Sequence, residues 1–435
     1  MSSGAESTTG IAGSSPQRKS RAGKLLQSGI IFSAISFLTG LGNLAFQIVL
    51  GHNLHSPGQF SKANGVINAI IPLLGLVPSV AVMAVTHYIA HFNAIGDATR
   101  LQELLAGCRK FLFRLTVFGS ILAIVAVKPL SSFFNLTSTT MLLLTIIYTL
   151  ISLWTSLATA LCQGLAWFNR LALIAFVAML LRLVFGYVAT LKWPYPEMSV
   201  LASVFSFLAY LILFHWKKDL SPPKQPVTST KLWNHEFILY LVVTGAFIVG
   251  NYCFSLSDLL VMQKYFSDTA SGDAYTAAER LAVSLPITVT PLLTVLFTNR
   301  SVEHSASALR EQFKLLGVFA AGLIFGAVCL YFLRHFCLHL LGKDVPGAAD
   351  MIQHLAVSMI FVGLLQAVGT WALASRWSKI SLLFGALGLS YTAIIFTVGK
   401  TPDTLLHIMP LVTGSAFVIL LLVWVVAMRR HKPVA

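Results

Sequence analysis

Long apolar runs separated by short polar connections dominate the pattern of this chain. A run of about 20 apolar residues is long enough to cross the hydrocarbon core of a membrane as a helix. Because the number of such runs is even, both termini are expected on the same side of the membrane. The twelve predicted spans are residues 27–50, 65–90, 111–127, 140–161, 171–191, 199–214, 237–262, 276–298, 315–333, 351–374, 380–398 and 407–428.

The basic residues are distributed unevenly between the two sides that these spans define. Twenty-one of the thirty Lys and Arg residues fall on the side of the termini and seven on the other side, while Arg182 and Arg280 lie inside apolar runs. Cytoplasmic connections of membrane proteins carry such an excess. The pattern therefore predicts that both termini are cytoplasmic.

Two stretches of the chain share the spacing of their Gly, Ala and Pro residues. Residues 58–78 read GQFSKANGVINAIIPLLGLVP, and residues 272–292 read GDAYTAAERLAVSLPITVTPL. Gly and Pro positions matter most to the backbone. The spacing predicts that the chain contains two copies of one fold. A shift of 214 residues brings together Gly58 and Gly272, Ala63 and Ala277, and Pro72 and Pro286.

The longest connection between spans lies near the middle of the chain and contains the sequence SPPKQP, which is typical of an extended linker. Six spans precede it and six follow, so the two lobes are expected to be parallel repeats related by an axis along the membrane normal. The predicted organisation is a disordered basic tail at 1–26, lobes at 27–214 and 237–428, a linker at 215–236 and a second tail at 429–435.

Composition supports an all-α integral membrane protein with about twelve transmembrane helices in two six-helix lobes. Hydrophobic residues make up 56% of the chain and charged residues 10%, and the mean hydropathy is +0.80. The net charge of +15 is explained by the basic side of the membrane, so no nucleic-acid partner is expected. The five cysteines have no metal-ligand or disulfide spacing, and neither metal nor cofactor is expected.

Arg182 is the most deeply placed charge that the sequence predicts. It lies about 16 Å along its helix, near the midplane of a hydrocarbon core about 30 Å thick. One interpretation is a cation that lines a water-filled cavity and binds an anionic substrate such as a phosphate. The alternative is a buried structural arginine satisfied by backbone carbonyls or by Asn43, Gln47 or Asn251.

Three further charges, Asp258, Glu279 and Arg280, lie within or at the ends of apolar runs. Asp258 and Arg280 are predicted at matching depths on consecutive helices, which favours an ion pair between them. The alternative is that Asp258 or Glu279 binds the proton or sodium ion that drives transport. Glu279 is equally compatible with a simple interfacial charge.

Polar and helix-breaking residues inside the spans give two more candidate features. Asn43 and Gln47 are one helical turn apart and would form a small polar face, for helix packing or for a hydroxyl-rich ligand. Four prolines would kink helices, either beside a cavity or only for packing. They are Pro72, Pro78, Pro286 and Pro291.

The sequence lacks the motifs of the enzymes that would be considered first. No GxxxxGK[ST] phosphate loop, HExxH or GxSxG occurs, and no connection exceeds about 22 residues. An enzymatic function is therefore not expected.

Several segments together resemble the polysaccharide or O-antigen flippases of the multidrug/oligosaccharidyl-lipid/polysaccharide exporter superfamily. A glycine followed closely by an aromatic and small residues comes after the first and seventh spans, in HSPGQFSKAN and SDTASGDAYTAAERLAVSLP. The acidic residue of the seventh span matches Asp258, and the turn CQGLAWFNRLAL is similar to the family's turn of glutamine, an aromatic and a basic residue. The residues that match are Gly58, Phe60, Ala63, Gly272, Tyr275, Ala277, Asp258, Gln163, Phe168 and Arg170.

The resemblance implies a multi-pass protein of the bacterial inner membrane that flips an undecaprenyl-pyrophosphate-linked oligosaccharide by alternating access around a cationic cavity. It implies membrane lipids and a polysaccharide polymerase or ligase as partners. This chain has fewer deep cations, since only Arg182 and the shallower Arg280 qualify, so the lipid pyrophosphate is the expected electrostatic partner. The alternatives are a cation-coupled multidrug exporter of the same superfamily and a membrane-embedded glycosyltransferase or polymerase.

Overall fold

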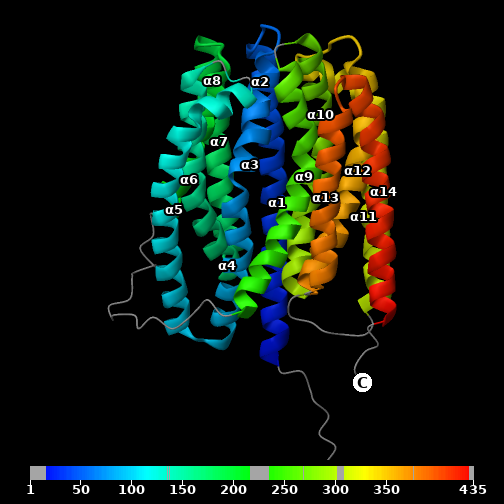
Figure 1. Cartoon of the computed structure of the whole chain (residues 1–435). Coiled ribbons are helices and arrows are strands. Elements are labelled where there is room, and N and C mark those ends of the chain that lie inside the picture. Colours follow the sequence, from blue (N-terminus) through cyan, green and yellow to red (C-terminus); the bar gives the residue numbers. More distant parts are fainter. Residues whose placement is uncertain are drawn as a thin grey trace, which may run out of the picture.

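The computed structural model describes residues 16–134, 136, 138–215, 235–267, 269–300, 308–375 and 377–430. Within these ranges the regular structure is entirely helical. Figure 1 shows the helices standing side by side as an upright bundle. A helix satisfies its backbone hydrogen bonds internally, which is the requirement that a bilayer imposes on a spanning segment. The predicted all-helical fold is confirmed.

The described ranges contain fourteen α-helices and one π-helix. In chain order these are α1 (Pro16–Asn53), α2 (Gln59–Gly65), η1 (Val66–Ile70), α3 (Ile71–Leu74), α4 (Leu76–Ile95), α5 (Ala98–Phe133), α6 (Thr139–Gly164), α7 (Phe168–Lys192), α8 (Pro196–His215), α9 (His235–Phe266), α10 (Ala270–Arg300), α11 (Ala308–Leu340), α12 (Ala348–Ala374), α13 (Ser378–Val398) and α14 (Pro402–Arg430).

These helices correspond to the twelve predicted spans. Among the described residues, nine helices are long and apolar enough to cross a membrane, namely α1, α6, α7, α8, α9, α11, α12, α13 and α14. The other predicted spans coincide with α5, with α10 and with the broken helix formed by α2, η1, α3 and α4. The layout agrees with a twelve-helix membrane protein.

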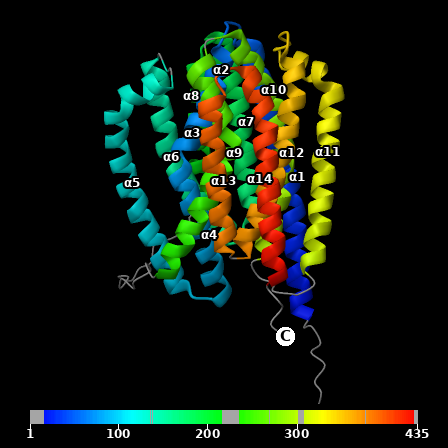
Figure 2. The same ribbon diagram turned by 45° about the vertical axis from the view of Figure 1, so that its right-hand side comes forward.

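Two groups of helices make up the bundle. Helices α1–α8 contact mainly one another, as do α9–α14. The groups meet where α1 and α2 contact α10 and where α4 contacts α9. In Figures 1 and 2, α1 begins and α14 finishes at the same end of the bundle. We call this the terminal end and the opposite one the distal end.

The first helix begins earlier than the sequence analysis predicted. Residues 16–26, assigned to a disordered tail, are part of α1. Arg, Lys, Leu, Gln and Ala are good helix formers, and extending a helix that is already nucleated costs little. Residues 1–15 and 431–435 of the two predicted tails and 216–234 of the predicted linker lie outside the described residues. The lobe boundaries stay predictions.

The two copies of the repeated stretch differ in backbone geometry. In the first copy the π-helix η1 precedes Pro72, whose ring would clash with the carbonyl four residues earlier in a regular α-helix. Pro78 then lies in the first turn of α4, where a missing N–H is tolerated. In the second copy α10 continues as one helix across Pro286 and Pro291. The described helix is interrupted in the first copy alone.

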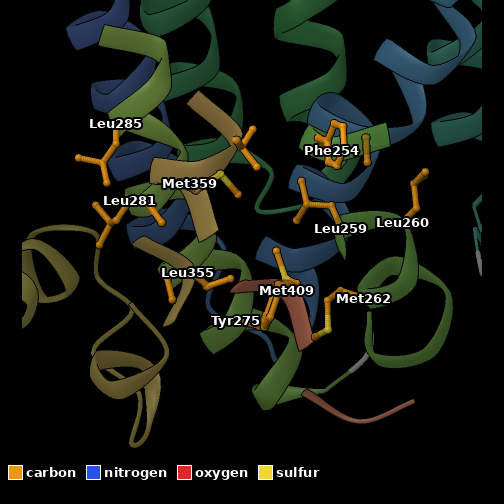
Figure 3. Close-up of a cluster of buried hydrophobic side chains, with 14 of the residues drawn as sticks. Phe254, Leu259, Leu260, Met262, Tyr275, Leu281, Leu285, Leu355, Met359 and Met409 are labelled. Carbon is orange, nitrogen blue, oxygen red and sulfur yellow. The ribbon is translucent and has the colours of Figure 1, made fainter. Parts of the chain in front are cut away.

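Apolar side chains cover the outer surface of the bundle as well as its interior. The exposed fractions are 74% for Val125, 77% for Phe332 and 70% for Leu411. Such exposure of large apolar side chains fits a surface that faces lipid rather than water. Figure 3 shows part of the interior, where Leu281 and Leu285 of α10 lie near Leu355 and Met359 of α12, with all four buried.

Glycines let α9 and α13 approach closely. A Cβ at Gly388 would lie 2.6 Å from the Cα and 2.9 Å from the carbonyl oxygen of Gly250. A Cβ at Gly385 would lie 2.6 Å from the carbonyl oxygen of Ala246. Small residues that allow such contact are typical of helix packing in membranes.

We expect Gly388→Ala to reduce stability by about 1–3 kcal/mol, because the added methyl group overpacks a backbone contact. The unfolding temperature of the purified protein in detergent measures this loss. Gly322→Ala in α11 is the matched control, since a Cβ there meets nothing within 4 Å. If the two variants unfolded at the same temperature, the close contact between α9 and α13 would be contradicted.

Candidate functional site

At the distal end, one carboxylate of the second group of helices caps a helix of the first. Asp273 lies in the first turn of α10, and its Oδ2 accepts a hydrogen bond from the Gly58 amide at 3.0 Å. Its Oδ1 accepts one from the Ser61 amide at 2.7 Å. These amides belong to the start of α2, where free N–H groups and the helix dipole favour an anion.

Lys343, in the connection between α11 and α12, completes this contact. Its Nζ donates to the carbonyl oxygen of Leu54 at 2.8 Å and lies 3.9 Å from Asp273 Oδ2. Burial lowers the pKa of Lys343, and the charge of Asp273 opposes this effect. Burial likewise raises the pKa of Asp273, and the Ser61 amide, Lys343 and the Gly58 amide oppose the rise. Each buried charge thus stabilises the other.

We call Leu54, Gly58, Ser61, Asp273 and Lys343 the distal clasp. Other contacts between the same two groups of helices surround it. Nε2 of His52 on α1 hydrogen-bonds with the carbonyl oxygen of Leu340 on α11 at 3.0 Å, and the Thr276 hydroxyl donates to Ser61 Oγ at 3.2 Å. The two groups are therefore joined at the distal end by polar contacts.

The clasp was missed in the sequence analysis, although both repeated stretches contribute to it. The shift of 214 residues aligns Gly58 with Gly272, and Asp273 follows directly. Asp273 lies just outside a predicted span, and Lys343 is one of the seven basic residues expected on the side opposite the termini. An acidic residue at the helix start beside a repeated glycine was the available signal.

Deep in the first group, Arg182 of α7 faces α1. Its Nη1 donates to Asn43 Oδ1 at 3.3 Å, and its guanidinium carbon lies 4.2 Å from the ring centroid of Phe46. Its Nε and Nη2 are shielded and have no hydrogen-bond partner among the described residues. Two of its three nitrogens therefore retain donor capacity for water or an anion.

The other two predicted polar partners, Gln47 and Asn251, form no hydrogen bond with Arg182 among the described residues. Of the candidates Asn43, Gln47 and Asn251, only Asn43 hydrogen-bonds with the guanidinium. Gln47 is buried, and its Oε1 has no partner in the described structure. The same holds for Oδ1 of the half-buried Asn251.

Two buried carboxylates lie inside the second group of helices. Asp258 of α9 and Glu279 of α10 are both fully buried. The Tyr275 hydroxyl donates to Asp258 Oδ2 at 3.0 Å, whereas Asp258 Oδ1 has no hydrogen-bond partner in the described ranges. Arg280 forms an ion pair with Glu279, and its Nε and Nη2 both donate to that carboxylate.

The predicted ion pair between Asp258 and Arg280 is therefore not what the structure contains. Arg280 pairs with its chain neighbour Glu279, because the long arginine side chain extends along α10 to the adjacent carboxylate. Asp258 still interacts electrostatically with Arg280 and Glu279. Two carboxylates and one guanidinium leave one negative charge without compensation when all three are ionised. A proton or a small cation would neutralise it.

Tyrosine hydroxyls complete this carboxylate cluster, and their role was not predicted. Tyr275 was noted only as part of the family resemblance, yet its hydroxyl contacts both Asp258 and the sulfur of Met409, at 3.2 Å. Tyr391 of α13 is fully buried, interacts electrostatically with both carboxylates and has a hydroxyl without a partner in the described residues. Figure 3 shows Tyr275 beside Met409.

Among the described residues, no set of three or more His, Cys, Asp or Glu side chains could hold a metal ion. The candidate site therefore consists of the clasp, Arg182 and the carboxylate cluster.

Comparisons with known proteins give the fold of this chain. No protein-family model matches, and no curated protein matches. A solved inward-facing multidrug resistance MATE family transporter of the MOP superfamily is 14% identical, with a TM-score of 0.65 and coverage of 93% of this chain and 99% of that one. The lipid II flippase MurJ, in an inward closed conformation, is also 14% identical, with a TM-score of 0.64 and coverage of 90% and 87%.

A third similar structure comes from Pyrococcus furiosus. It is a MOP superfamily transporter whose binding pocket is described as reversed in polarity; it is 14% identical, with a TM-score of 0.61 and coverage of 93% and 95%. These similarities extend over nearly the whole chain. They establish that the chain has the fold of the MOP superfamily.

We expect Asp273→Ala to open the distal end. The change leaves Lys343 buried without its carboxylate and removes the acceptor of two α2 amides, and breaking a buried pair costs about 3–5 kcal/mol. A cysteine placed at the fully buried Leu54, in a variant without the five native cysteines, would then react faster with a membrane-impermeant maleimide added from the distal side.

Asp350→Ala provides the control for this labelling experiment, because Asp350 is an exposed carboxylate in the first turn of α12. Labelling in that variant should match the parent protein. Equal labelling of the Asp273→Ala and Asp350→Ala variants would contradict the role of the clasp in closing the distal end.

Proposed function

We propose that this protein transports an undecaprenyl-pyrophosphate-linked oligosaccharide across the bacterial inner membrane by alternating access, for surface polysaccharide biosynthesis. The observation that carries the proposal is Arg182, a guanidinium in the middle of α7 with two nitrogens that have no partner in the described structure. A guanidinium pairs well with phosphate oxygens, and a deep cation is costly unless it has such a use.

The similar solved structures support the transport part of this proposal. They include an exporter and a lipid flippase that share one fold. In the proposed orientation the terminal end, which carries most of the basic residues, faces the cytoplasm. The lipid-linked headgroup enters from that end while the distal clasp keeps the other end closed.

Coupling to an ion gradient is proposed for the carboxylate cluster. Asp258 has one oxygen without a hydrogen-bond partner among the described residues, and the cluster bears an uncompensated negative charge when ionised. Loading a proton or a sodium ion would remove that charge and change the electrostatic cost of moving the helices. Asp258 and Glu279 are the residues proposed for this step.

A cation-coupled multidrug exporter is the second candidate function. The MATE transporter among the similar structures favours it, as do the buried carboxylates, which would attract a cationic drug. Arg182 disfavours it, because a deep guanidinium repels such a substrate. The choice between the two candidates therefore depends on what binds at Arg182.

Translocation of a fluorescent undecaprenyl-pyrophosphate-linked sugar in proteoliposomes tests the first proposal. We expect Arg182→Ala to lower the rate by roughly 10- to 100-fold, since a hydrogen bond to a charged group contributes about 1.5–3 kcal/mol. Arg182→Lys should retain part of the activity, because it keeps the charge but loses the bidentate geometry.

Arg100→Ala is the matched control, because Arg100 is an exposed arginine paired locally with Asp97. It should transport like the wild type. If the wild-type protein moved no lipid-linked sugar but lowered the accumulation of cationic dyes, the flippase proposal would be wrong and the drug exporter would replace it.

The coupling proposal is tested with Asp258→Asn. Asparagine can still accept the hydrogen bond of Tyr275 but carries no charge, so we expect the variant to transport at a rate that no longer responds to an imposed proton or sodium gradient. Asp403→Asn, at an exposed position near the distal end, should respond like the wild type. A gradient response that survives in Asp258→Asn would exclude this carboxylate from coupling.

A further inference from the structure

A cavity opens between the two groups of helices on the terminal side. It has a volume of about 470 Å³ and is lined by His87, Tyr88 and His91 of α4, Tyr240 of α9, Leu373 near the end of α12 and Ser378 at the start of α13, among others. Figures 1 and 2 both show the first part of α9 beside α4 near the terminal end. Neither Arg182 nor the carboxylate cluster lines this cavity.

Aromatic rings from both groups of helices form one continuous wall. The ring centroids of His87 and Tyr240 lie 4.9 Å apart with planes tilted by 33°, so this pair joins α4 to α9. Tyr88 stands edge-on to both rings, with centroids 5.6 Å from His87 and 6.4 Å from Tyr240. Aromatic faces and edges at these distances offer a broad apolar surface.

The polar groups of the lining are hydroxyl and imidazole groups. Tyr88, Tyr240 and Ser378 supply hydroxyls, while His87 and His91 are one helical turn apart on α4. Hydroxyls and neutral imidazoles can both donate and accept hydrogen bonds. Among the described residues that line the cavity, none is Asp, Glu, Lys or Arg.

This combination fits an uncharged sugar ring. A pyranose has apolar C–H faces that pack on aromatic rings and hydroxyls at its edge that both donate and accept, and a volume of 470 Å³ lies in the usual range for small-molecule sites. A cationic ligand is disfavoured because the described lining residues include no carboxylate to pair with it.

We propose that this cavity binds an uncharged pyranose ring of the transported headgroup, an inference that rests on the proposed function. His87, Tyr88 and Tyr240 contact the ring faces, and the hydroxyls and imidazoles bind its edge. Because α4 and α9 belong to different groups, the site is complete only while these helices are adjacent. Movement of the two groups apart would divide the site and release the sugar.

Saturation-transfer NMR with the purified protein in nanodiscs tests this inference. The probes are the methyl glycosides of glucose, galactose, mannose and N-acetylglucosamine, with glucuronate and tetraphenylphosphonium as charged comparisons. We expect at least one neutral glycoside to bind, and Tyr240→Ala to weaken that binding roughly three- to tenfold, the effect of losing one aromatic contact. Tyr240→Phe should retain more of it.

Tyr195→Ala is the control for folding and for unspecific contact, because Tyr195 is exposed at the distal end. It should bind like the wild type. If no neutral glycoside bound more tightly to the wild type than to Tyr240→Ala, or if only tetraphenylphosphonium depended on Tyr240, the sugar site would be overturned.

The translocation assay separates this inference from the proposed function. We expect Tyr240→Ala to raise the KM for the lipid-linked sugar while kcat changes little, provided that the wild type transports it. Wild-type transport that Tyr240→Ala leaves unaltered in both parameters would overturn the site and leave the flippase intact. If the protein bound a neutral glycoside but moved no lipid-linked sugar, the proposed flippase function would be overturned, whereas the cavity would still be a sugar-binding site.

Discussion

A charge buried away from water must be compensated by nearby partners, and for Asp273 those partners come mostly from the other half of the chain. Two backbone amides of α2 hydrogen-bond with its carboxylate, and Lys343 lies between this carboxylate and a carbonyl oxygen at the end of the first helix. Separating the halves here would leave the charges of Asp273 and Lys343 either exposed to solvent or buried with fewer partners. This pair therefore joins the halves at the distal end, opposite the terminal end at which a cavity lies between them.

Each half contains a charged site with unsatisfied groups. The first has the Arg182 guanidinium, of which two nitrogens have no partner among the described residues, and the second has two buried carboxylates, of which only Glu279 pairs with a guanidinium. An anionic group near the first and a cation near the second would each complete an unsatisfied site.

Apolar run length predicted the helical fold, because a bilayer fixes the length of a spanning helix. Charges within these runs were the signal for Arg182, Asp258, Glu279 and Arg280, which are buried or half-buried. Pairing was not predictable in the same way. Matching depth suggested Asp258 with Arg280, but side-chain conformation decides the pairing, and Arg280 reaches its chain neighbour Glu279. Tyr391 had no such signal, because its interaction with Asp258 and Glu279 involves helices distant in the sequence, whereas Asp273 was marked only by its place beside the repeated glycine at a helix start.

The π-helix in the first repeated stretch has a consequence for the orientation of everything after it. A π turn contains about one residue more than an α-helical turn, and each α-helical residue corresponds to about 100° of rotation around the axis. Because the π turn fits this extra residue within a single turn, α3 and α4 keep the phase relative to α2 that a helix one residue shorter would give them. One residue deleted from the regular part of α4 before His87 would have no such compensation, and it would swing His87 and Tyr88 by roughly 100° away from α9 while Ser61 kept its place. The wide turn therefore preserves the alignment between the distal contacts of α2 and the terminal contacts of α4.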